Sequence, residues 1–134
     1  MNSSEAYCII GAGASGLAAA KNLQQQGIAC QVLEQETELG GVWNYASPNS
    51  GVYRSTHLIS SKPLTEFPDF PMPTHYPDYP GHRQVQAYFQ AYAEHFVLRP
   101  SIEFGRHVKR WRGRKVVAGG FTSTMTKRAA IVAW

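Results

Sequence analysis

Apolar residues form two short runs near the start of the chain, and each run ends at a residue type with distinctive chemistry. Ala6–Ile10 leads directly into a glycine-rich turn, and Ile28–Leu33 leads into the acidic Glu34. Runs of this length without alternation are typical of strands buried in a parallel sheet. Between them, residues 17–26 are rich in good helix formers, and Gly27 stands where a helix would end. The pattern predicts a strand, a crossover helix and a second parallel strand.

A long segment without regular periodicity follows, over residues 37–81. Five of the eight prolines lie between Pro68 and Pro80, and aromatic residues are interleaved with them. A disordered linker would be polar and poor in aromatics. We therefore expect an ordered loop that packs its rings on the domain: Phe67, Phe70, Tyr76 and Tyr79.

Helical spacing returns over residues 82–96. The apolar positions Val85, Tyr88, Phe89, Tyr92 and Phe96 share one helical face, which predicts an amphipathic helix packed on the domain. Arg99-Pro100 is expected to end this helix, and Ile102–Phe104 is a candidate for a further strand. The elements together predict an α/β fold: a Rossmann-like domain with a partial parallel sheet and a crossover helix.

The turn after the first run has the G-x-G-x-x-G form that binds the diphosphate of a dinucleotide. Gly11 permits the bend from strand to helix, Gly13 lacks the Cβ that would block the diphosphate, and Gly16 allows close packing of helix and strand. Ser15 is expected to donate a hydrogen bond near the diphosphate. Glu34 stands at the spacing of the acid that binds the adenosine ribose, and an acid there disfavours the 2′-phosphate of NADP.

The residues after Glu34 bear on whether the cofactor is FAD or NAD. A second glycine pair, Gly40-Gly41, would let the backbone approach a bulky ligand, and Trp43 would add a flat apolar surface. This arrangement favours a flavin; the alternative is an ordinary turn with a tryptophan in the core. The expected cofactor-binding residues are Gly11, Gly13, Ala14, Ser15, Gly16, Glu34, Gln35, Gly40, Gly41, Val42 and Trp43.

At this point the sequence resembles a known family. GAGASG at 11–16, the acid Glu34, ELGGVW at 38–43, FPDFPMP at 67–73 and the helix at 85–93 are similar to the FAD-binding amino-terminal part of the flavin-containing monooxygenases. The resemblance implies FAD as cofactor, with NADPH and O₂ used to oxygenate a nitrogen or sulfur centre of a small-molecule substrate. The cofactor supplies that redox chemistry, and protein groups position it.

Two departures from the family pattern limit what the resemblance implies. The family has an asparagine beside the flavin where this chain has Ile59, and His57, Ser60 or Ser61 are candidates to replace it. The second glycine turn, which binds NADPH in the family, is not found in this chain. We therefore expect FAD binding without a recognisable NADPH site, and a fragment that is inactive alone. No catalytic residue is identified.

Charge divides the chain near Arg106. All nine acidic residues precede it, whereas residues 106–134 contain eight of the thirteen Lys and Arg residues. We expect a dinucleotide-binding segment over 1–105 and a poorly ordered basic tail over 106–134, with the family resemblance ending near His107-Val108. A changed reading frame would explain the tail; the alternative is a basic arm for nucleic acid or an anionic membrane.

The remaining Asp, His and Cys residues are interpreted as structural rather than catalytic or metal-binding. Asp69 and Asp78 each follow a proline and are expected to form turns. The five histidines show no metal-ligand spacing, and Cys8 and Cys30 are expected to be buried reduced thiols, so we predict no metal site. The chain has no membrane-spanning run and no signal peptide, which predicts a cytoplasmic protein. A module that binds FAD or NAD without oxygenation, and a nucleic-acid binder, remain the alternative functions.

Overall fold

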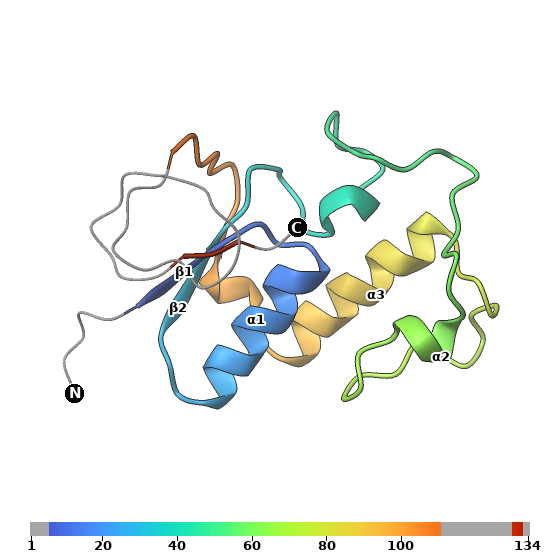
Figure 1. Cartoon of the computed structure of the whole chain (residues 1–134), viewed down its shortest axis with the longest axis horizontal. Coiled ribbons are helices and arrows are strands. Elements are labelled where there is room, and N and C mark those ends of the chain that lie inside the picture. The colour runs from blue at the N-terminus through green and yellow to red at the C-terminus, as the bar shows by residue number, and fades with distance from the viewer. Residues whose placement is uncertain (1–5, 111–129, 133–134) are drawn as a thin grey trace.

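The centre of the fold is a parallel β-sheet (Figure 1). The structure is a computed structural model that describes residues 6–110 and 130–132. The sheet has the order β3-β2-β1-β4, and its strands are β1 (Tyr7–Ile10), β2 (Cys30–Leu33), β3 (Ile102–Glu103) and β4 (Ala130–Val132). All three pairings are parallel. This is the strand order of one half of a doubly wound dinucleotide-binding sheet, so the predicted α/β fold is confirmed.

The strands follow the apolar runs closely. β1 and β2 lie within the two predicted runs, and β3 confirms the predicted third strand. Val32 lies in the middle of the sheet, opposite Ile9 on one side and Ile102 on the other, and it is fully buried. β4 lies in the segment that we expected to be poorly ordered, and it pairs with β1 along Ala130–Val132.

Helix α1 (Ala14–Gln25) makes the crossover between β1 and β2, as predicted. Leu17 and Ala20 are fully buried on the face that packs against the sheet. Gly27 has φ +68°, a left-handed conformation in which glycine is favoured, and its N–H donates to the carbonyl of Gln24. Gly27 therefore ends the helix in the predicted way.

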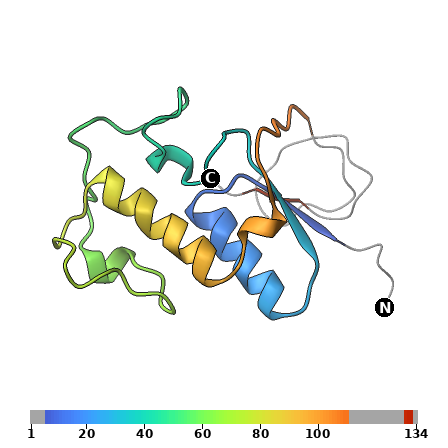
Figure 2. The ribbon, with the colours of Figure 1, turned by 180° about the vertical axis from the view of Figure 1, so that it is seen from behind.

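Helix α3 (His82–His95) confirms the second predicted helix and lies beside α1 in both views (Figures 1 and 2). Its apolar face is the main part of the core away from the sheet. Val85, Tyr88 and Tyr92 are each 1% exposed, and Phe96 is partly buried against them. The helical spacing in the sequence therefore identified the correct face.

The proline-rich loop packs three of its four rings on the domain. Phe67 lies 4.3 Å from Tyr92 between ring centroids, and Phe70 and Tyr76 also pack against the core. Tyr79 is 52% exposed, so the expectation for that ring is wrong. It lies between two residues whose carbonyls accept loop N–H groups, and its own side chain is left facing outward.

A short helix, α2 (Lys62–Thr65), supports this loop through its first side chain. The Lys62 ammonium donates to three carbonyls, those of Pro73, Thr74 and Tyr76. Two 3₁₀ turns complete the described elements: η1 (Gly41–Trp43) and η2 (Arg99–Ser101). No helix in the described ranges has both the length and the apolar character needed to cross a bilayer.

Candidate functional site

The glycine turn lies at the carboxyl end of β1, the edge of a parallel sheet where ligands bind. Gly11 follows β1 with φ +94°, and its N–H donates to the carbonyl of Leu33 at the end of β2. Gly13 is the N-cap residue of α1, and its carbonyl accepts the first helical hydrogen bond from Leu17. The turn therefore connects the ends of both central strands to the start of the helix.

The amino end of α1 is available for an anion. No side chain caps it, and no acidic residue stands in its first turn. The N–H groups of the first turn, to which Ala14 and Ser15 belong, have no acceptor within the helix and carry the positive end of the helix dipole. Ser15 is exposed beside them, whereas Gly16 is buried in the packing face. A diphosphate is a suitable ligand for such a helix end.

Glu34 is held firmly next to this turn. It directly follows β2, is 4% exposed, and accepts hydrogen bonds from the N–H of Ala12 at 2.6 Å and from the N–H of Glu36 at 2.9 Å. Each carboxylate oxygen keeps a second acceptor position. The acid that was expected to bind a ribose is therefore fixed beside the glycine turn.

The second glycine pair packs on the first turn. Gly40 donates its N–H to the carbonyl of Ala12, and a Cβ on Gly41 would lie only 3.1 Å from the Cα of Gly13. We expected the pair to let the backbone approach a ligand; in the structure the nearest neighbour of a Cβ on Gly41 would be the first glycine turn itself. Gly41 also has φ +56°, so two separate constraints favour glycine there.

Val42 and Trp43 differ in position. Val42 is 56% exposed and lines a cavity next to the glycine turn, whereas Trp43 is partly buried against the hydrophobic core and is not one of the residues that line the cavity. The expected flat surface for a flavin is thus not seen in the cavity wall. The alternative in which the tryptophan packs on the core describes its position.

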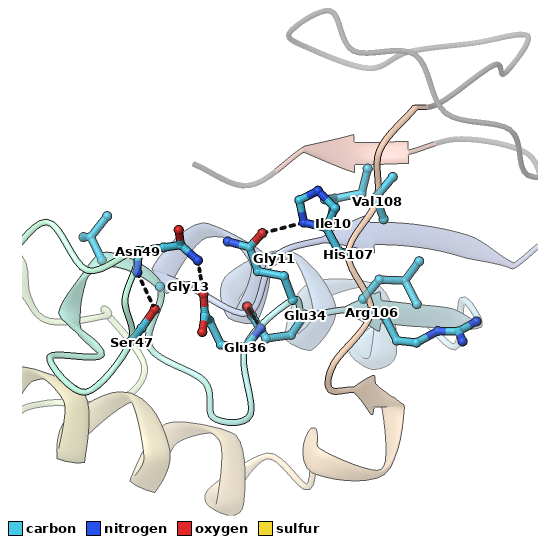
Figure 3. A pocket seen from close by; sticks show the side chains of 14 residues that line it. Ile10, Gly11, Gly13, Glu34, Glu36, Ser47, Asn49, Arg106, His107 and Val108 are labelled. Carbon is cyan, nitrogen blue, oxygen red and sulfur yellow. Dashed lines mark hydrogen bonds between the residues drawn. The ribbon is translucent and has the colours of Figure 1, made fainter.

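The cavity has a volume of about 270 Å³ and lies at the ends of β1 and β2 (Figure 3). Six of the predicted residues line it: Gly11, Gly13, Glu34, Gln35, Gly41 and Val42. The other predicted residues lie nearby in the helix start and the second glycine turn. The cavity wall also includes residues that the sequence did not identify: Glu36, Ser47, Asn49, Arg106, His107 and Val108.

One unpredicted wall is the loop after η1. The amide of Asn49 donates to the carboxylate of Glu36 at 2.7 Å, and the Asn49 N–H donates to the Ser47 hydroxyl at 3.0 Å (Figure 3). The first bond connects the loop after η1 to the loop after β2, and the second lies within the loop after η1. A serine and an asparagine beside a proline indicate a turn, but nothing in that pattern points to a site.

The other unpredicted wall is the chain just after β3. The N–H of Arg106 donates to the carbonyl of Glu34, and Nδ1 of His107 lies 2.8 Å from Oε1 of Gln35 (Figure 3). The Arg106 guanidinium turns away to Glu103, 3.2 Å distant. Residues 106–108, which we assigned to the basic tail, therefore line the same cavity as the glycine turn.

Ile59, which replaces the family asparagine, is 99% exposed and does not line this cavity. None of its candidate replacements lines it either. The Ser60 hydroxyl is hydrogen-bonded to Thr65, and the His57 ring to the carbonyl of Ser55. The geometry of the described residues thus provides no substitute for that asparagine at the candidate site.

Asp69 has a role that its sequence context did not suggest. Its carboxylate forms an ion pair with Lys21 of α1, whose side chain is 10% exposed, and this contact fixes the proline-rich loop to the helix. The hydrogen bond and charge of Lys21 lower the pKa of Asp69 below its ordinary value. Asp69 therefore lies in a turn, as expected, and also connects the proline-rich loop to α1. Within 6–110 and 130–132, no group of three or more His, Cys, Asp and Glu side chains is placed to hold a metal ion.

Comparison with known proteins identifies the family. The family model described as "Flavin-binding monooxygenase-like" matches residues 5–124. The chain belongs to this family. It is 38% identical to flavin-containing monooxygenase 5 of Oryctolagus cuniculus over 100 residues, which cover 72% of this chain and 19% of that protein. The structure of a flavin-containing monooxygenase from Stenotrophomonas maltophilia matches with a TM-score of 0.71 at 26% identity, covering 96% of this chain and 38% of that one.

The flavin-binding monooxygenase family match extends further than we expected from composition. It continues to residue 124, and flavin-containing monooxygenase FMO GS-OX2 of Arabidopsis thaliana is 31% identical over 159 positions that cover 97% of this chain and 35% of that protein. The expected end of the resemblance near His107-Val108 is therefore wrong. β4 has only three residues, which is too short for a periodic pattern to show, and its pairing with β1 defines it. The changed reading frame stays a prediction.

Proposed function

We propose that this chain binds FAD at the cavity beside the glycine turn, as the FAD-binding part of an NADPH- and O₂-dependent monooxygenase that oxygenates a nitrogen or sulfur centre of a small molecule. The family membership supports a flavin and a monooxygenase reaction. The chain spans 19% of the length of flavin-containing monooxygenase 5 and 35% of GS-OX2, so the reaction of the whole protein is a proposal for this chain.

One observation supports FAD binding above all others. The buried carboxylate of Glu34 is fixed 2.6 Å from the Ala12 N–H, inside the glycine turn and next to the uncapped end of α1. An acceptor for the ribose and donors for the diphosphate thus lie next to each other, just as the ribose and the diphosphate are neighbours in adenosine diphosphate. The residues present therefore fit the adenosine diphosphate half of FAD.

The size of the cavity agrees with this assignment. At about 270 Å³ it lies just below the roughly 300–1,000 Å³ typical of small-molecule pockets, so it suits part of a dinucleotide. The side chains of Gln35 and His107 meet across one end of it, and Asn49 and Glu36 meet across another. We place the adenosine among these polar side chains, with the rest of FAD extending past Gly41 and Val42.

The protein groups have distinct roles in this proposal. The N–H groups at the start of α1 bind the diphosphate, and Glu34 accepts hydrogen bonds from the ribose hydroxyls and repels a 2′-phosphate. Gly41 keeps side-chain atoms away from Gly13, so that the turn stays open to the diphosphate. The cofactor, when bound, supplies the redox chemistry.

A second candidate is a module that binds NAD or FAD without oxygenation. The described geometry favours it to the extent that Trp43 packs on the core and Ile59 stands away from the cavity, because neither contributes a flavin surface there. Use of NADPH, a location in the cytoplasm and the absence of a nucleic-acid role stay predictions for this chain.

Comparative nucleotide binding tests the proposal. The full chain is titrated with FAD, NAD and NADP, followed by fluorescence quenching or calorimetry. We expect FAD to bind most tightly and NADP most weakly. Glu34→Gln replaces an acceptor oxygen by a donor, and we expect it to weaken FAD binding by about tenfold or more.

The matched control is Glu94→Gln, which removes an exposed carboxylate on α3 away from the cavity and should leave FAD affinity unchanged. Tighter binding of NAD than of FAD would favour the second candidate. A folded chain that binds none of the three nucleotides would contradict both.

A further inference from the structure

A second cavity, of about 420 Å³, lies at the amino end of α3 and shares no residue with the candidate FAD site. The loop side contributes Arg54, Thr56 and His57, and the start of the helix contributes residues 81–84. The two sides are joined by a bridge between His57 and Gly81 and by the His82 N–H, which donates to the carbonyl of Thr56 at 3.0 Å. The cavity is therefore built from two connected segments.

Two unpaired arginines flank this cavity. Within the described ranges, the side chains of Arg54 and Arg83 are in no ion pair or hydrogen bond, and both residues are exposed. The other basic side chains of residues 6–105 all have partners: Lys21 contacts Asp69, Lys62 contacts three carbonyls, and Arg99 contacts Glu38. No acidic residue lines the cavity. The two Lys or Arg side chains of residues 6–105 that lack a partner in the described ranges thus lie at the same cavity.

The helix end adds donors to the same place. The 14-residue helix α3 has no acidic residue in its first turn. The Gly81 N–H donates to the side chain of Gln84, and the His82 N–H is used by Thr56, but the N–H groups of Arg83 and Gln84 have no acceptor in the described part of the chain. They lie at the positive end of the helix dipole, where anions are stabilised.

His82 provides a separate indication that the cavity lacks a polar partner. The residue is 4% exposed and belongs to the cavity wall. Its Nδ1 is the one buried side-chain nitrogen or oxygen, among the described residues, that has no hydrogen-bond partner. Buried polar atoms are nearly always hydrogen-bonded, so an unsatisfied one in a cavity wall points to a missing polar group.

We propose that this cavity is a second binding site, for an oxyanion of the phosphate class. The Arg54 and Arg83 guanidiniums bind its oxygens, and the N–H groups of Arg83 and Gln84 donate to it from the helix. A guanidinium presents paired donors that match phosphate geometry, which favours phosphate over a monatomic anion. The site is independent of the proposed FAD site, because the two share no residue.

Phosphate binding to the full chain tests this proposal. The chain is titrated calorimetrically with inorganic phosphate and, separately, with phenyl phosphate, each with and without FAD. The two ligands distinguish free phosphate from the phosphate group of an ester. Arg54→Gln/Arg83→Gln removes two positive charges from the cavity, and Lys109→Gln/Arg110→Gln removes two exposed positive charges elsewhere. Circular dichroism verifies that both variants keep the fold.

We expect saturable binding of at least one of the two ligands, unaffected by FAD. The cavity variant should weaken it by about tenfold or more, as for loss of charged hydrogen bonds, and the control variant should weaken it by less than about twofold. Equal binding by all three proteins, loss in the control variant only, competition by FAD, or no saturable binding would each overturn the proposal. If the full chain binds phosphate but does not bind FAD, only the proposed function is contradicted.

Discussion

At the scale of single residues, the hydroxyl of Tyr88 connects the proline-rich loop to α3. It accepts a hydrogen bond from the Phe67 N–H at 2.7 Å and donates one to the carbonyl of Phe70. Burial raises the pKa of Tyr88 to about 12, so the group stays a neutral donor at physiological pH. The sequence predicted that Tyr88 is buried, but the two backbone groups that it satisfies depend on tertiary structure.

We expect Tyr88→Phe to lower the free energy of unfolding by about 1–2 kcal/mol, because it leaves a partly buried N–H and a partly buried carbonyl without partners. Urea denaturation measures the change. Tyr92→Phe is the control, since no hydrogen bond to its hydroxyl is found among the described residues and its ring is equally buried. Equal losses for the two variants would show that the Tyr88 hydroxyl has no special role.

The ion pair of Lys21 and Asp69 predicts a pH dependence. The pKa of Asp69 is lowered from an ordinary value of 3.8 by the hydrogen bond and charge of Lys21. The stabilisation is therefore fully present above the ordinary pKa and is lost as the pH falls through the lowered one. We expect Asp69→Asn to destabilise the chain at pH 7, and the difference from wild type to shrink below about pH 4.

Denaturation at several pH values measures this difference. Asp78→Asn serves as the control, because it removes an exposed carboxylate from the same loop and that carboxylate has no ion-pair partner in the described ranges. A destabilisation by Asp69→Asn that is constant from pH 7 to pH 3 would refute the ion-pair account.

At the scale of elements, the contact between the two glycine turns gives a direct test. Gly41→Ala would combine a left-handed backbone with a Cβ 3.1 Å from the Cα of Gly13. Gly27→Ala is the matched control, since Gly27 has a similar φ of +68° and nothing within 4 Å of a Cβ. Each change costs about 1 kcal/mol of backbone strain.

Only Gly41→Ala is expected to disturb the diphosphate turn, and it should weaken FAD binding by about tenfold or more. Gly27→Ala should lower the melting temperature and leave FAD affinity unchanged. FAD titration and thermal unfolding are measured for both variants. Together they distinguish the backbone strain, which both variants share, from the close contact with Gly13, which only Gly41→Ala introduces. Equal FAD affinities in the two variants would mean that the close approach to Gly13 has no effect on binding.

The elements also show which sequence signals were sufficient. Helix α3 was predicted from periodicity and α1 from its helix-forming residues, and Gly27 correctly marked the end of α1. No glycine marks the end of α3: Val97 has φ +54°, although β-branched residues disfavour that conformation. β4 could not be predicted because its pairing with β1, rather than any local pattern, defines it.

At the scale of the whole molecule, the sequence predicted the glycine turn but only part of the cavity beside it. Gly11, Gly13 and Glu34 stand in a local motif whose spacing has a physical meaning. Asn49 and His107 come from loops that the fold brings together, and neither loop has a motif of its own. Composition suggested a boundary at residue 106, but packing against Glu34 continues across it.

The central claim is that this chain binds FAD at the cavity beside Gly13 and Glu34. The most direct measurement is the visible absorption spectrum of the full chain after incubation with FAD and gel filtration, with the flavin content related to the protein content. We predict that flavin elutes with the protein at about one FAD per chain, as for a single preformed site. A folded chain that elutes colourless, with all the FAD in the small-molecule fraction, would contradict the claim.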